Sequence, residues 1–101
     1  MKYSEIVSEI NIRIAKSKMS NSLNSFFIGL TNYIEDDTLT KHQINKNDWF
    51  LQLPADSLEI AADVVCYFGM MGMNTRHAEI VYQAVERMWV YCYKITMHSV
   101  E

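Results

Sequence analysis

The chain has 101 residues, of which 50% are hydrophobic and 21% are charged, and its formal net charge is −3. The length excludes a chain of several domains, and the proportions of hydrophobic and charged residues exclude a disordered protein. We therefore predict one helical domain over residues 1–101. Three glycines and one proline are too few for the frequent turns of sandwiches and barrels, so the composition predicts a few long helices.

The charge pattern gives little sign of a nucleic-acid or membrane partner. Arg13, Lys16 and Lys18 form a loose basic group that a solvated helix face explains, so nucleic acid is an unlikely partner. No run reaches 18 uninterrupted apolar residues, and the acidic N-terminal segment lacks the apolar region of a signal peptide. Cys66 and Cys92 lie in apolar patterns, which predicts buried free thiols in a cytoplasmic protein, with a disulfide between them as the alternative.

The first half of the chain shows two helical patterns. Apolar residues repeat at helical spacing over residues 4–18, which predicts a helix capped by Ser4, although the alternation of Ile10, Ile12 and Ile14 also allows a strand. A second stripe predicts a helix over 21–35 and consists of Leu23, Phe26, Phe27, Leu30, Tyr33 and Ile34.

The middle of the chain is less regular. The acids of 35–37 have the wrong sign for a helix C-terminus, so we assign them to the turn that follows the second helix. Thr40 and Gln43 have the spacing of a capping box for a short helix over 41–44. The apolar segment 49–53, stopped by Pro54, is predicted to be either one helical turn or an extended segment.

The second half of the chain has the clearest helix signals. Asp56 and Glu59 have the spacing of a capping box for a helix over 57–71, and Gly72 is a natural residue for the turn that ends it. Asn74 then caps a last helix over 75–98. The short connection predicts an antiparallel pair, so the expected fold is all-α, a small bundle of four to five helices with a long C-terminal helical hairpin.

These two helices carry more apolar surface than a small monomer needs to bury. Tyr and Trp are common in protein interfaces because they join a large apolar area to a polar tip. Coverage by the N-terminal helices, or a small-molecule groove, would also account for the surplus. We select seven residues as candidates for partner binding: Tyr82, Trp89, Val90, Tyr93 and Met97, with Tyr67 and Met71 as a second patch.

Candidate catalytic chemistry is sparse. His42, His77 and His98 lack zinc-ligand spacing with either cysteine. Residues 58–65, LEIAADVV, resemble the second acidic motif of the all-α MazG-like nucleoside triphosphate pyrophosphohydrolases, and this resemblance implies Glu59 and Asp63 as Mg²⁺ ligands. Ile60 stands where the family has a further carboxylate, and the helix predicted over 21–35 lacks the family's Glu-x-x-Glu pair.

The sequence therefore favours a non-enzymatic protein without cofactor or metal. We expect a cytoplasmic regulator, adaptor or inhibitor that binds another protein, or a second copy of itself as a homodimer, through apolar and aromatic helix faces. Small size and the lack of catalytic groups are typical of accessory proteins of phages and mobile elements, including those that inhibit host machinery. A Mg²⁺-dependent pyrophosphohydrolase of the MazG-like type is the alternative.

Overall fold

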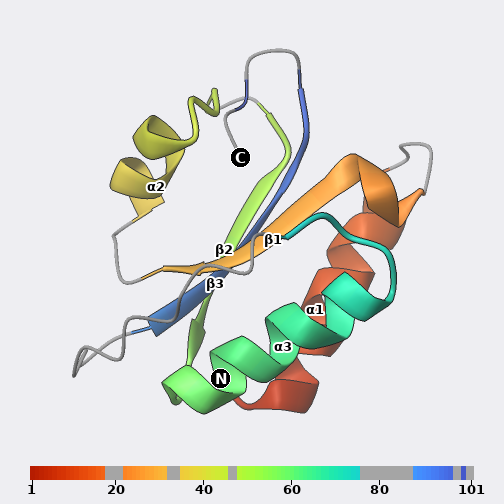
Figure 1. Ribbon diagram of the computed structural model, residues 1–101, viewed down its shortest axis with the longest axis vertical. Helices are drawn as coiled ribbons and strands as arrows, with labels where there is room; N and C mark the ends of the chain where they lie inside the picture. Colours follow the sequence, from red (N-terminus) through yellow and green to blue (C-terminus); the bar gives the residue numbers. More distant parts are fainter. Residues whose placement is uncertain (18–21, 32–34, 46–47, 76–87, 97–98, 100–101) are drawn as a thin grey trace.

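The computed structural model describes residues 1–17, 22–31, 35–45, 48–75, 88–96 and 99. Within these ranges the elements are α1 (Tyr3–Lys16), η1 (Leu23–Ser25), β1 (Phe26–Thr31), α2 (Glu35–Lys41), β2 (Phe50–Ala55), α3 (Leu58–Met70) and β3 (Met88–Lys94). The strands form an antiparallel sheet in the order β1-β3-β2. Helices α1 and α3 cover one side of this sheet, and α2 lies on the other side (Figure 1).

The predicted all-α bundle is wrong, because two segments expected in helices are strands. Residues 26–31 lie in β1 instead of a helix over 21–35, and residues 88–94 lie in β3 instead of a helix over 75–98. The expected C-terminal helical hairpin is therefore replaced by a helix, α3, followed by a strand. Both strands bury residues on both of their sides, so neither shows the polar–apolar alternation by which a strand is usually recognised.

Other predictions for the first half of the chain have mixed outcomes. The N-terminal helix is confirmed, but it begins after Lys2 and not at Ser4. The extended alternative for 49–53 is confirmed by β2. The short helix over 41–44 is wrong, because α2 ends at Lys41 and begins at Glu35. The acids of this segment thus lie in the first turn of α2, where the helix dipole favours negative charge.

β3 is the central strand, and its successive residues face opposite sides of the sheet. Cys92 pairs with Ile28 and Leu51, and these residues belong to the hydrophobic cluster beneath α1 and α3. Tyr93 pairs with Phe27 and Phe50, and these residues belong to the cluster on the α2 side. A strand with a covered face on each side must be apolar at almost every position, as β3 is.

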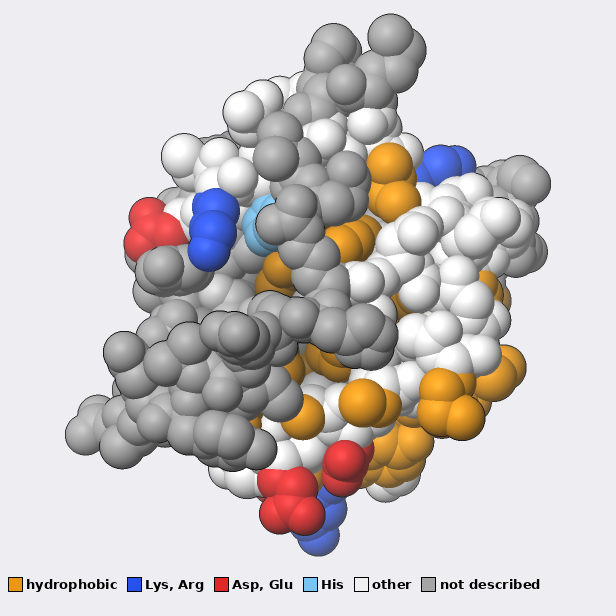
Figure 2. Space-filling model, in the orientation of Figure 1, with side chains coloured by type: hydrophobic (Ala, Val, Ile, Leu, Met, Phe, Trp, Pro, Cys, Tyr) orange, Lys and Arg blue, Asp and Glu red, His pale blue; other side chains and the backbone are white. Residues whose placement is uncertain are grey.

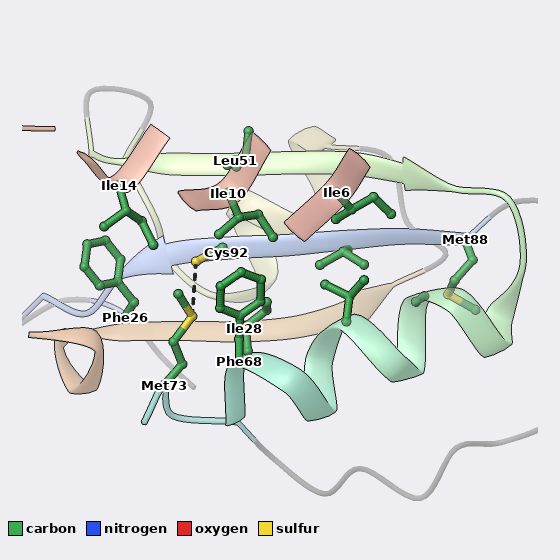
Figure 3. Close-up of a cluster of buried hydrophobic side chains, with 13 residues drawn as sticks. Ile6, Ile10, Ile14, Phe26, Ile28, Leu51, Phe68, Met73, Met88 and Cys92 are labelled. Carbon is green, nitrogen blue, oxygen red and sulfur yellow. Dashed lines mark hydrogen bonds between the residues drawn. The ribbon is translucent and has the colours of Figure 1, made fainter. Parts of the chain in front are cut away.

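The main core fills the space between the sheet and the pair α1 and α3 (Figure 3). Helical spacing of three and four residues places one buried stripe on each helix, which is why both helices were recognisable in the sequence. The helices contribute Ile6, Ile10, Ile14, Ala61, Val64 and Phe68. The strands contribute Phe26, Ile28, Leu51, Met88, Val90 and Cys92.

Different interactions define the two ends of α3. Its N-cap is Ser57, whose side chain accepts a hydrogen bond from the Ile60 amide at 3.1 Å, so the predicted capping by Asp56 is wrong by one residue. Asp56 instead binds the N-terminal amine of Met1 at 2.7 Å. At the other end Gly72 has a φ of 117°, which confirms its predicted role in the terminating turn.

Candidate protein-binding surface

The structure separates the residues of the first predicted patch, which consists of Tyr82, Trp89, Val90, Tyr93 and Met97. Val90 is 1% exposed in the main core, and Tyr93 is completely buried between the sheet and α2. Trp89 is half-buried at the start of β3, opposite Thr31 and Pro54. Tyr82 and Met97 lie outside the described residues. Val90 and Tyr93 thus already contact the protein's own interior on opposite sides of the sheet, because the strand geometry divides residues that a helix would have aligned.

The second predicted patch, Tyr67 and Met71, is brought together at the C-terminal end of α3. The Tyr67 ring meets the Tyr3 ring of α1 edge to face, with 6.3 Å between the ring centroids. It also contacts the Phe68 ring, at 5.0 Å between centroids. Met71 follows Tyr67 by one helical turn and is 55% exposed.

Two residues that the sequence analysis did not select extend this patch. Met70 is 89% exposed, the highest fraction among the large hydrophobic residues that the structure describes, and Tyr3 is 38% exposed. We call Tyr3, Tyr67, Met70 and Met71 the α3 patch. Hydrophobic side chains gather over the α1 and α3 side of the molecule, towards the lower right of Figure 2.

The end of α3 explains why adjacent methionines have opposite environments. The amide of Met73 donates to the carbonyl of Phe68 at 3.0 Å, and the amide of Gly72 donates to that of Gly69 at 3.2 Å. This Schellman turn reverses the chain and buries Met73 in the main core. Met70 and Met71 lie within this turn, before Gly72, and their side chains stay exposed. The run Met70-Met71-Gly72-Met73 indicates in the sequence that apolar side chains gather here. Which of these methionines are exposed depends on the geometry of the turn.

The two cysteine thiols also differ in exposure. Both cysteines are free, but Cys66 is exposed on α3, so the prediction that it is buried is wrong. Cys92 is buried in the main core, and its Sγ donates to Met73 Sδ at 3.9 Å (Figure 3). Burial raises the pKa of the Cys92 thiol far above its usual range, because the interior solvates a thiolate poorly. Cys92 is therefore a neutral core residue.

The carboxylates implied by the MazG-like resemblance, Glu59 and Asp63, are exposed on α3 one turn apart. Among the described residues, no group of three or more His, Cys, Asp or Glu side chains is placed to hold a metal ion. In the parts of the chain that the structure describes, no helix combines the length and the apolar character needed to cross a membrane.

Comparisons with family models, with curated proteins and with solved structures found no match to this chain. The all-α fold implied by the MazG-like resemblance is contradicted by the sheet.

Proposed function

We propose that this protein is a non-enzymatic regulator, adaptor or inhibitor that acts in the cytoplasm and binds another protein through the α3 patch. The observation that carries this proposal is the exposure of Met70 and Met71, at 89% and 55%, about one helical turn after Tyr67, whose ring contacts that of Tyr3. Methionine side chains are flexible and polarisable, and they are common on surfaces that adapt to a partner.

The energy available from covering this patch is sufficient for a binding hot spot. Burying a methionine side chain completely contributes about 1.5–3 kcal/mol. Since Met70 is almost fully exposed and Met71 about half exposed, covering both contributes about 2–4 kcal/mol. The exposed carboxylates of Glu59 and Asp63 lie on the same helix, about 16 and 10 Å along its axis from Met70, so they add negative charge on one side of the patch. A partner with an apolar centre and basic residues on one side of it fits this combination.

The proposal is tested by the double substitution Met70→Glu and Met71→Glu. Charged side chains at these exposed positions leave the main core intact but oppose desolvation of the patch. Ile12→Glu is the matched control, because Ile12 is an exposed hydrophobic residue at 44% on the side of α1 opposite its buried stripe. Thermal unfolding establishes that all three proteins are equally folded.

Binding is measured by quantitative cross-linking in native cell extract, followed by titration of the purified partner against each protein. Light scattering over a range of concentrations covers the case in which the partner is a second copy. We expect the double substitution to weaken the complex by at least about 30-fold, or about 2 kcal/mol, and the control to leave it unchanged. A complex that tolerates the double substitution, or loses affinity equally with Ile12→Glu, contradicts the proposal.

A further inference from the structure

Within the described residues, the hydrophobic packing of helix α2 and its terminal turn belongs to one cluster that is separate from the main core. The seven residues of α2 are fewer than the 12–15 or so that an isolated helix needs for stability in water, so the helix depends on its packing. Its aliphatic anchors are Leu39 and, just after the helix, Ile44. Both belong to a cluster with Phe27, Tyr91 and Tyr93, and the main core contains no described residue of α2.

The sheet presents a group of aromatic rings to α2. The rings of Tyr91 and Tyr93 are almost parallel, at 6°, and Phe27 lies within 28° of both, with centroids 5.3–6.2 Å apart. His42, which follows α2, places its ring 5.1 Å from Tyr91 and 5.5 Å from Tyr93. Its Nε2 is 3.0 Å from the hydroxyl of Tyr91, which is hydrogen-bonding distance. His42 therefore links α2 to the rings by a polar contact as well as by packing.

The turn that ends α2 repeats the turn that ends α3, with one unfavourable difference. The Ile44 amide donates to the Leu39 carbonyl at 2.9 Å, as the Met73 amide donates to that of Phe68. In α3 the residue with positive φ is glycine, whereas in α2 it is Gln43, with a φ of 54°. A side chain at this conformation is disfavoured, so the α2 turn is the less stable of two otherwise matched turns.

We propose that α2 and its terminal turn, residues 35–44, open away from the sheet as one unit while α1, α3 and the sheet remain folded. The segment is poised for this because its packing is separate from the main core and its final turn is strained. It lies apart from α1 and α3, on the opposite side of the sheet (Figure 1). Segments with few buried contacts are those that open at low free energy in native proteins.

Opening changes what the protein presents to its surroundings. It removes Leu39, Ile44 and His42 from the rings of Phe27, Tyr91 and Tyr93, which uncovers an aromatic surface on the face of the sheet that α2 covers. In the closed state Tyr93 is fully buried and Tyr91 nearly so. The inference stands on these contacts and holds whether or not the α3 patch binds a partner.

Hydrogen exchange of two matched amides tests the proposal in the intact chain. The Ile44 and Met73 amides occupy equivalent positions in the two turns, so each reports the opening of its own helix end. After correction for intrinsic rates, we expect Ile44 to exchange at least about tenfold faster than Met73. Low urea concentrations should accelerate Met73 but have little effect on Ile44, because local opening exposes little surface. Equal rates with equal urea dependence overturn the proposal.

Substitutions beside α2 and in the main core separate local from global opening. Gln43→Gly relieves the strained turn and should slow exchange at Ile44 by about fivefold, whereas Tyr91→Phe removes the hydroxyl that meets His42 and should accelerate it by about fivefold. Val64→Ala weakens the main core, which stays packed when α2 opens, so it should accelerate exchange at Met73 by at least about tenfold and leave Ile44 unchanged. If Val64→Ala accelerates both amides equally, α2 opens only with the whole protein and the proposal fails.

Discussion

Replacement of Gly29 by alanine tests the strand β1 directly. Gly29 pairs with Tyr91 of β3, and the Tyr91 ring lies across its backbone. A Cβ atom on Gly29 would lie 2.6 Å from Cζ and Oη of Tyr91 and 2.8 Å from Cε1, closer than real Cβ contacts. The ring would have to move, although it is buried and packs with Phe27, Tyr93 and His42.

The expected change follows from three contributions. Forcing an extra methyl group into a packed site costs about 1–3 kcal/mol. Displacing the Tyr91 hydroxyl from His42 removes a hydrogen bond with a net contribution of about 1 kcal/mol. Alanine recovers about 0.5–1 kcal/mol, because glycine loses more backbone freedom on folding. We therefore expect Gly29→Ala to lower the free energy of unfolding by about 2 kcal/mol. The helix predicted over 21–35 gives the opposite sign, a gain of about 1 kcal/mol.

Urea unfolding followed by circular dichroism measures this difference. The control repeats Gly29→Ala in a Tyr91→Leu background, where the ring that meets the new Cβ is absent. There the substitution should be neutral or stabilising, so the double-mutant cycle should show coupling of at least about 1.5 kcal/mol. Stabilisation by Gly29→Ala in the otherwise unchanged protein, or the same loss in both backgrounds, would refute the packing described for β1 and β3.

Three further results are expected. Ser57→Ala should lower the free energy of unfolding by about 1 kcal/mol, because the Ile60 amide loses its cap; an unchanged urea midpoint contradicts this cap. A thiol reagent should label Cys66 in the folded protein but Cys92 only after unfolding, and mass spectrometry distinguishes the two sites. Since burial raises the pKa of Cys92, the unfolded chain releases a proton above about pH 8.5 that the folded chain retains, so stability should fall by up to about 1.4 kcal/mol per pH unit. Cys92→Ala should lack this component of the slope; an identical slope in both proteins contradicts it.

The parts of the fold that were predictable are those with a single buried side. Helix α1 buries Ile6, Ile10 and Ile14 and exposes the rest of its surface, so its helical period is visible in the sequence. Helix α3 shows the same spacing, and Gly72 marks its end. The candidate site was predictable to the same extent: Tyr67 and Met71 lie on this helix end, and Met70 was missed because its exposure depends on the turn.

The strands β1 and β3 were not predictable by the same method, because each is covered on both sides. In β1 the buried pair Phe26 and Phe27, followed by Leu30, gives intervals that also fit a helix. In β3 nearly every residue is buried, so no polar residue marks a solvent side. Periodicity cannot distinguish a fully buried strand from a buried helix, and the tertiary arrangement decides.

The change of fold also changes the argument for binding. A helix buries one stripe, so an apolar residue outside that stripe counts as surplus surface that requires a partner. A central strand buries two faces, and β3 uses both: Val90 faces α1 and α3, while Tyr93 faces α2. Most of the surplus inferred from the sequence is therefore internal packing in the described structure. Among the described residues of this half of the chain, the exposed large hydrophobic side chains are at the end of α3, where the Schellman turn leaves Met70 and Met71 outside, and the binding proposal depends on these two residues.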